Sequence, residues 1–285
     1  MLTPIMLRSF GRSGSTLLMQ VLGTNDNVIF DRDYPCETRH LTYLYRLASL
    51  PSQAFNNDKN WNQDSLFDKN LDRLGSIPFS NTDIIRRDNL KEGYLKHLWA
   101  AFSREALLNS NDSVDPSKPC YYAEKVVQDI CNDVNSNMAA KNLFLIRDPR
   151  DEFLSIKSFN KKRNFNGFGW NENDTDESFA LKLCQMRKQF LIHLNAVQKD
   201  DRRIVVKYED FLSSPIEGTS ELSEWLNLEL DYSKISNPSE QFKDHITSNN
   251  VNDSLFRWKK ELPKEILNIF KDNIGKELEL LNYEI

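Results

Sequence analysis

The stretch "LRSFGRSGSTLLMQVLG" at residues 7–23 decides the fold. A short apolar segment leads into a loop of small residues, and apolar residues then recur at the spacing of an amphipathic helix. Gly11 and Gly14 let the backbone turn tightly with its N–H groups pointing inward, and the following helix adds the positive end of its dipole. The pattern predicts a strand, an anion-binding loop and a helix. A glycine turn before a serine-capped helix would have the same pattern.

The loop lacks the lysine of a nucleoside triphosphatase. When Gly14 is aligned with the second glycine of G-x-x-x-x-G-K-[ST], Ser9 stands at the first glycine and Ser15 at the lysine. Ser15 and Thr16 offer only hydroxyl and amide hydrogen bonds, while Arg12 supplies a positive charge from inside the loop. Magnesium-dependent ATP chemistry is therefore disfavoured.

Composition limits the possible partners. The chain has 285 residues, is 39% hydrophobic and carries a net charge of −5, which indicates a single domain over residues 1–285 with a full core. An acidic chain disfavours nucleic acid and anionic membranes as partners. No segment approaches about 18 uninterrupted apolar residues, so we expect a cytoplasmic protein without membrane insertion. The cysteines lack metal-type spacing and are expected to be free thiols, with no metal site: Cys36, Cys120, Cys131 and Cys184.

Strand-like and helix-like segments alternate along the chain. The segments with strand character are 4–9, 27–32, 120–125, 142–147 and 203–208. The segments with helical period are 14–22, 38–49, 92–108, 177–199, 217–226 and 263–281. This alternation predicts a three-layer α/β fold with a mostly parallel central sheet and helices on both faces.

Three polar excursions interrupt the alternation, at 51–90, 160–176 and 229–256, and all are rich in Asn, Asp and Ser. Ligands bind at the carboxyl ends of parallel strands, so long loops there are candidate lids or walls of an acceptor site. Ordinary solvated loops have the same composition.

A second informative stretch is "KNLFLIRDPRDEFLSIKSF" at residues 141–159. An apolar strand ends at Arg147, Asp148 fits a helix N-cap, and Pro149 fits the first helical position. Ser155 lies on the same helix face about 10 Å along the axis, so Arg147 and Ser155 are placed to hold one anion. Asp148 as the magnesium ligand of a Walker B strand is the alternative, but it lacks a partner lysine.

Four motifs, "FGRSGSTLL", "LFLIRDPRDEFLSI", "VVKYEDF" and "FRWKKEL", together resemble the sulfotransferases that use 3′-phosphoadenosine 5′-phosphosulfate (PAPS). The resemblance spans nearly the whole chain and implies a P-loop-like fold that needs neither a metal nor the Walker lysine. It implies that Arg147 and Ser155 bind the 3′-phosphate and that the first motif binds the 5′-phosphosulfate through Arg12, Ser13, Gly14, Ser15 and Thr16. Many relatives carry proline where this chain has Gly11.

The segment "YPCETRHL" at residues 34–41 is similar to protein-tyrosine sulfotransferases. In that group the glutamate, here Glu37, is the catalytic base and the arginine, here Arg39, contacts the acceptor. Such a base takes the proton from an acceptor hydroxyl as the sulfuryl group arrives. An acidic residue that complements a helix dipole is the alternative for Glu37. His40 is a candidate to assist at the acceptor, or an ordinary histidine.

The resemblance also assigns roles at three later positions. Lys125 in "YYAEKVV" would stabilise negative charge on the bridging oxygen together with Arg12, and Glu124 is a substitute base. Tyr208 matches a position that lines the nucleotide pocket, and Arg257 lies where relatives close a loop over the adenine and 3′-phosphate. A solvent-facing lysine and a packed tyrosine are the structural alternatives.

The resemblance implies in-line transfer of a sulfuryl group from PAPS to an acceptor hydroxyl. The acceptor class stays open among a sugar, a lipid or polyketide hydroxyl, a phenol and a peptide tyrosine, and oligomeric state is not indicated. A P-loop metabolite kinase and a non-catalytic nucleotide- or partner-binding domain are the alternatives.

Overall fold

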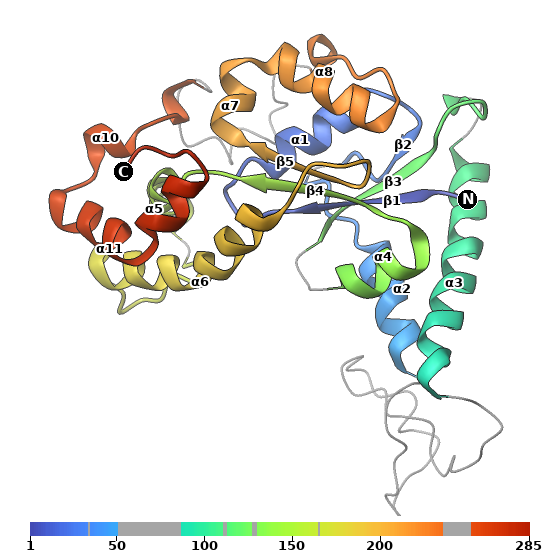
Figure 1. Cartoon of the computed structure of the whole chain (residues 1–285), viewed down its shortest axis with the longest axis horizontal. Coiled ribbons are helices and arrows are strands. Elements are labelled where there is room, and N and C mark those ends of the chain that lie inside the picture. Colours follow the sequence, from blue (N-terminus) through green and yellow to red (C-terminus); the bar gives the residue numbers. More distant parts are fainter. Residues whose placement is uncertain (34, 51–86, 111–112, 127–129, 165, 236–251) are drawn as a thin grey trace, which may run out of the picture.

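The computed structural model describes residues 1–33, 35–50, 87–110, 113–126, 130–164, 166–235 and 252–285 (Figure 1). Of the three predicted excursions, most of 51–90 and the central part of 229–256 lie outside the described residues.

The centre of the fold is a five-stranded sheet with all pairs parallel, in the order β2-β3-β1-β4-β5. The strands are β1 (Thr3–Arg8), β2 (Val28–Ile29), β3 (Tyr121–Val126), β4 (Lys141–Ile146) and β5 (Arg203–Lys207). After β1 the chain continues to β2 at one edge of the sheet, and after β4 it continues to β5 at the opposite edge. The carboxyl ends of β1 and β4 therefore form the topological switch point, where α/β sheets bind ligands.

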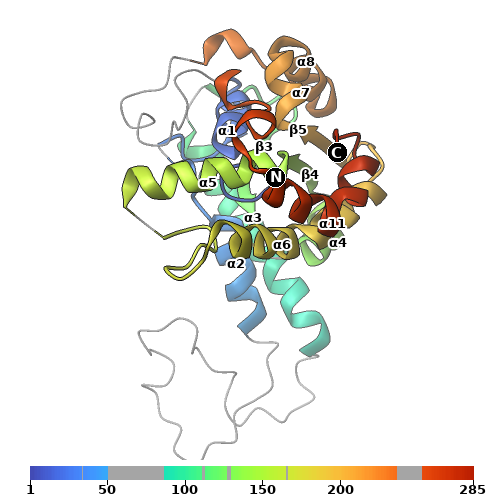
Figure 2. The same cartoon turned by 90° about the vertical axis from the view of Figure 1, so that its left-hand side faces the viewer.

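Helices cover both faces of this sheet, which confirms the predicted three-layer architecture (Figures 1 and 2). One face carries α1 (Ser15–Leu22), α7 (Tyr208–Ser213) and α8 (Pro215–Leu226). The other carries α2 (His40–Ser49), α3 (Arg87–Asn109) and α4 (Cys131–Met138) beside β1 and β3. Beside β4 it carries α5 (Pro149–Arg163), α6 (Asp176–Ala196), α10 (Trp258–Glu261) and α11 (Lys264–Leu280).

Side-chain alternation along β1 supplies both faces of the core. Ile5 and Leu7 pack into the cluster with α1, whereas Met6 packs into the cluster with α2 and α3. All three side chains are fully buried. A strand that is apolar on both faces is typical of a central position in a parallel sheet, so the core itself fixes where the loop after β1 begins.

Besides the short helices α7 and α10, which were not predicted, three elements differ from the sequence prediction. The strand expected at 27–32 is only Val28–Ile29, and it lies at the sheet edge with one partner strand. Helix α4 was not predicted, because its sequence is rich in Asn; burial of Val134 and Met138 overrides that weak propensity. Helix α5 runs to Arg163, into the excursion expected at 160–176, and Asn164 then ends it in the left-handed conformation.

Among the described residues, no helix combines the length and the apolar character needed to cross a bilayer.

Candidate functional site

The loop after β1 forms a cradle of backbone N–H groups. Arg12 and Gly14 have positive φ angles of 72° and 92°, which turns the chain sharply before α1. Gly14 is the N-cap of α1, and within the described residues no side chain caps the start of that helix. This geometry favours an anion site over the serine-capped helix that the sequence left open, because the first-turn N–H groups still require acceptors.

Tyr208 lies directly against this loop. A Cβ atom at Gly14 would lie 2.4 Å from the Tyr208 ring, so glycine is required there for space as well as for its φ angle. The Tyr208 hydroxyl is 3.3 Å from the Ser254 hydroxyl. The residue at the end of "VVKYEDF" therefore closes one side of the loop, next to the chain segment that carries Ser254.

Arg147 follows β4 and is 5% exposed. Its Nη1 donates to the Arg12 carbonyl at 3.0 Å, and its Nη2 donates to the Ser254 carbonyl at 2.7 Å. Its guanidinium carbon lies 4.8 Å from the Tyr208 ring centroid. The buried Nε has no hydrogen-bond partner among the described residues, so one donor of the fork is left for a ligand.

Arg12 joins this group from inside the loop. Its Nε donates to the Ser155 hydroxyl at 3.3 Å, and its guanidinium carbon lies 4.6 Å from the Phe159 ring centroid. Burial and then the positive charge of Arg147 lower the pKa of Arg12 to about 10. Two guanidinium groups are thus held close together beside a buried serine, and an anion between them would relieve their repulsion.

A second group lies around Lys125 at the end of β3. Its Nζ donates to the Thr16 hydroxyl at 2.9 Å and to the Pro35 carbonyl at 2.7 Å, and it lies 3.6 Å from a Glu37 carboxylate oxygen. The Lys125 side chain is 8% exposed and that of Glu37 is 44% exposed. Burial lowers the pKa of Lys125, while Glu37 opposes that shift. The pair places a cation against the loop and a carboxylate at the opening to solvent.

Arg39 and His40, the two residues predicted to contact the acceptor, lie in different surroundings. Arg39 lies 3.5 Å from the Glu37 carboxylate, on the same exposed segment. The His40 ring instead packs 5.0 Å from the Phe102 ring, in the aromatic group between α2 and α3. That position joins His40 to the helical layer and not to the ion pair of Glu37 and Lys125.

Glu124 is not free to act as a substitute base. Its carboxylate accepts hydrogen bonds from the N–H groups of Leu41 and Thr42, at 2.7 and 3.0 Å, and from the Thr42 hydroxyl at 2.6 Å. The Tyr122 hydroxyl donates to it at 3.0 Å. Burial raises the pKa of Glu124. Its role is to anchor the start of α2, next to the segment that carries Glu37.

Asp148 does not serve as a magnesium ligand in this arrangement. One carboxylate oxygen accepts from the Arg150 N–H at 2.9 Å and caps α5, as predicted. The same oxygen and its neighbour also accept from the Arg150 guanidinium, at 3.0 and 2.8 Å. Within the described part of the chain, no three His, Cys, Asp or Glu side chains gather as metal ligands.

Arg257 approaches α5 from the carboxyl-terminal segment. It donates to both carboxylate oxygens of Glu261 at 2.8 Å, and its Nη2 lies 3.4 Å from the hydroxyl of Ser158, one turn beyond Ser155. Its Nη1 is buried and has no hydrogen-bond partner among the described residues. Arg257 therefore contacts α5 through Ser158 and keeps one buried donor atom that no described residue pairs.

Two contacts at the site were missed by the sequence reasoning. Ser254 accepts from Arg147 through its backbone carbonyl, which leaves no signature in the sequence. Phe168, in the predicted excursion 160–176, covers Gly11: a Cβ atom there would lie 2.3 Å from the ring. Gly11 was the signal in the sequence for this contact, because a glycine can mark a place where another group approaches the backbone closely.

A cavity of about 300 Å³ lies beside the same excursion. Its lining residues come from the second half of α5 and the segment after it: Lys157, Asn160, Lys161, Asn164, Asn166 and Trp170.

The described cysteines, Cys36, Cys120 and Cys184, are free thiols.

Comparisons with protein-family models and with curated proteins find no match. Among solved structures, a sulfotransferase domain from the curacin biosynthetic pathway is 17% identical with a TM-score of 0.53, and the match covers 100% of this chain and 99% of that one. A sulfotransferase domain from the Synechococcus PCC 7002 olefin synthase is 16% identical with a TM-score of 0.52, covering 100% and 96%. The chain therefore has the α/β fold of these sulfotransferase domains.

Proposed function

We propose that this protein is a PAPS-dependent sulfotransferase that transfers a sulfuryl group to an acceptor hydroxyl. The observation that carries the proposal is the convergence of Arg12, Arg147 and Ser155 beside an uncapped helix start, at the switch point of the sheet. Similarity of fold to two sulfotransferase domains supports it.

The residues present fit a nucleotide with phosphates at both its 3′ and 5′ positions. Arg147 and Arg257 each retain a buried donor atom that no described residue pairs, which suits a 3′-phosphate next to Ser155 on α5. The loop from Arg12 to Thr16 presents the uncapped N-terminus of α1 to the 5′ end. When bound, PAPS would supply the transferable sulfuryl group.

Side chains of the loop and of β3 would provide the chemistry. Glu37, half exposed and 3.6 Å from Lys125, is placed to take the proton of an acceptor hydroxyl that enters from solvent. Lys125 and Arg12 are fixed cations beside the loop, and preorganised charge of this kind is most effective where negative charge develops during transfer. Arg39 would contact the acceptor beside Glu37.

The acceptor class stays among hydroxyl groups of sugars, lipids or polyketides, phenols and peptide tyrosines. A P-loop metabolite kinase is the second candidate from the sequence, but the described site offers it neither the Walker lysine nor a free Asp148 carboxylate.

A transfer assay with two donors tests the proposal. The protein is incubated with a mixture of a sugar, a fatty alcohol, a phenol and a tyrosine peptide, either with ³⁵S-labelled PAPS and a chelator or with γ-³²P-labelled ATP and Mg²⁺. We expect label to move only from PAPS and without metal. Label transferred from ATP and none from PAPS would contradict the proposal.

A further inference from the structure

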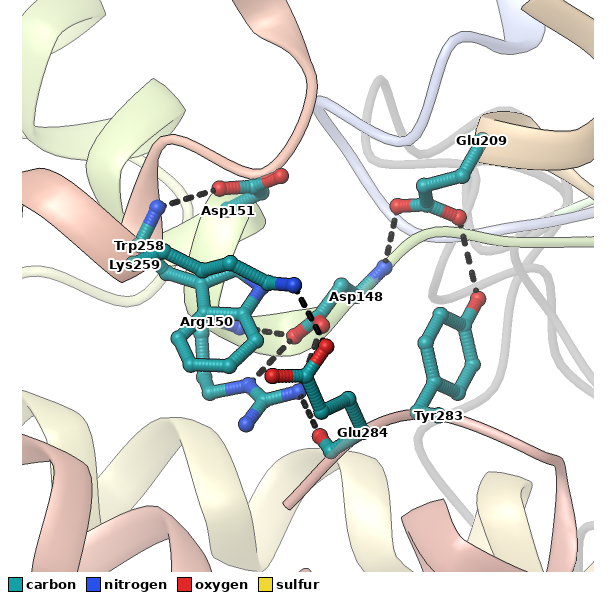
Figure 3. Close-up of polar contacts among 8 residues, drawn as sticks. All are labelled: Asp148, Arg150, Asp151, Glu209, Trp258, Lys259, Tyr283 and Glu284. Carbon is teal, nitrogen blue, oxygen red and sulfur yellow. Dashed lines mark hydrogen bonds and ion pairs between the residues drawn. The ribbon is translucent and has the colours of Figure 1, made fainter. Parts of the chain in front are cut away.

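A buried hydrogen-bond chain connects Tyr283 through Glu209 to the backbone N–H of Asp148 (Figure 3). The Tyr283 hydroxyl donates to Glu209 Oε2 at 3.1 Å, and Glu209 Oε1 accepts from the Asp148 N–H at 2.8 Å. That N–H belongs to the peptide bond that follows Arg147. Tyr283 is 9% exposed and Glu209 3% exposed, so both groups depend on each other for hydrogen bonds.

A second arm of the network reaches the chain segment that covers Arg147. Arg150, paired with Asp148, donates to the Glu284 carbonyl at 2.5 Å, and its guanidinium carbon lies 3.5 Å from the Trp258 ring centroid. The backbone N–H of Trp258 donates to the Asp151 carboxylate at 2.9 Å. Figure 3 shows these groups gathered around the start of α5. The segment held in this way also supplies Ser254 and Arg257.

We infer that the carboxyl-terminal residues Tyr283 and Glu284 are positioning residues for 3′-phosphate recognition. They touch no part of the nucleotide cradle themselves. Tyr283, through Glu209, fixes the peptide bond from which the Arg147 side chain extends, and the Glu284 carbonyl, through Arg150, supports the docked position of Trp258. The inference rests on the proposed function and adds the segment after α11 to its site.

The side chains of Tyr283 and Glu284 differ in expected importance. Glu284 contributes to the second arm through its carbonyl, whereas its carboxylate pairs with Lys259; those two side chains are 65% and 41% exposed, and exposed pairs contribute little. The Tyr283 hydroxyl is bonded to the buried Glu209 side chain, and removing one partner of a buried hydrogen bond leaves the other unsatisfied at a cost in free energy. The hydroxyl of Tyr283 is therefore the group whose removal should have the larger effect.

The test compares two nucleotides in titration calorimetry: adenosine 3′,5′-bisphosphate (PAP) and AMP, which lacks the 3′-phosphate. Tyr283→Phe keeps the ring and removes the hydroxyl, and we expect it to weaken PAP binding about tenfold while AMP binding stays within about twofold. Tyr94→Phe on the exposed face of α3 is the matched control and should change neither. Glu284→Gln should change PAP affinity by less than about twofold.

Variants at Glu209 separate positioning from general stability. In Glu209→Gln the amide oxygen can still accept from the Asp148 N–H, so the preference for PAP over AMP should largely survive. Glu209→Ala removes that acceptor, and the preference for PAP should be lost. Wild-type preference for PAP with an unchanged ratio in Tyr283→Phe, or an equal loss for both nucleotides, would overturn this inference alone. Absence of any wild-type preference for PAP would overturn the proposed function and this inference with it.

Discussion

Arg147 donates a hydrogen bond to the backbone carbonyl of Arg12 at 3.0 Å, although the two residues are 135 positions apart in the chain. They follow β4 and β1, which are neighbouring parallel strands, so the sheet itself brings them together. Two guanidinium groups held at one edge of the sheet, next to the hydroxyl of Ser155, form an electropositive site.

Arg147→Ala should weaken PAP binding by about 100-fold, because it removes the buried positive charge and the one charge-assisted hydrogen bond left for the ligand, worth roughly 1.5–3 kcal/mol. AMP binding should change far less, since the 5′ end is held by the loop at Arg12–Thr16. Titration calorimetry with both nucleotides measures this. Arg104→Ala, on an exposed part of α3, is the control. Unchanged PAP affinity would show that Arg147 does not bind the 3′-phosphate.

Glu37→Gln should lower turnover by about 10²-fold or more and leave nucleotide affinity nearly unchanged, because the amide cannot take a proton but keeps the size of the side chain. Glu105→Gln on the exposed face of α3 provides the matched loss of one charge. The rate is measured once an acceptor has been identified with labelled PAPS. Equal turnover in Glu37→Gln and wild type would remove Glu37 from the role of base.

Gly11→Ala should destabilise the fold by about 1–3 kcal/mol, since the new methyl group enters the space of the Phe168 ring. Adding Phe168→Ala should recover part of that loss, because the two changes act on one contact. Urea unfolding of both single variants and the double variant measures the coupling. Strictly additive free energies would contradict a direct contact between these positions.

The stability contributed by Asp151 and Glu209 should fall as the pH rises from about 4 to about 7. Burial raises the pKa of Asp151 to about 6 and that of Glu209 to about 7, from ordinary values of 3.8 and 4.5. Between these limits the folded chain keeps protons that the unfolded chain has released, so each step up in pH favours unfolding. Urea titrations at a series of pH values measure the slope, which Glu209→Gln should reduce. A Glu209→Gln variant with the wild-type slope would mean that Glu209 does not titrate in this range.

Periodicity and motif order were sufficient to predict the parallel sheet and most of its helices. They succeeded because the decisive residues are local: Gly14 and the apolar run after it specify a turn and a helix, and Asp148 and Pro149 specify the start of α5. Helix α4 was missed, because its stability comes from the burial of Val134 and Met138 and not from propensity.

Contacts made through the backbone or by distant segments were not predictable. The carbonyl of Ser254 and the terminal Tyr283 reach the neighbourhood of Arg147 from far along the chain, and neither belongs to a motif. Glu124 was considered as a base because it is adjacent to Lys125. In a strand, adjacent side chains point to opposite faces, so Glu124 serves the helix layer and Lys125 the loop.

The most direct test of the central claim is the ratio of the dissociation constants of PAP and AMP for the wild-type protein, measured by titration calorimetry in the presence of a chelator. We predict that PAP binds at least about 100-fold more tightly, because only PAP carries the 3′-phosphate that Arg147, Arg257 and Ser155 would hold. Equal affinity for the two nucleotides, or tight binding only of ATP with Mg²⁺, would contradict the account.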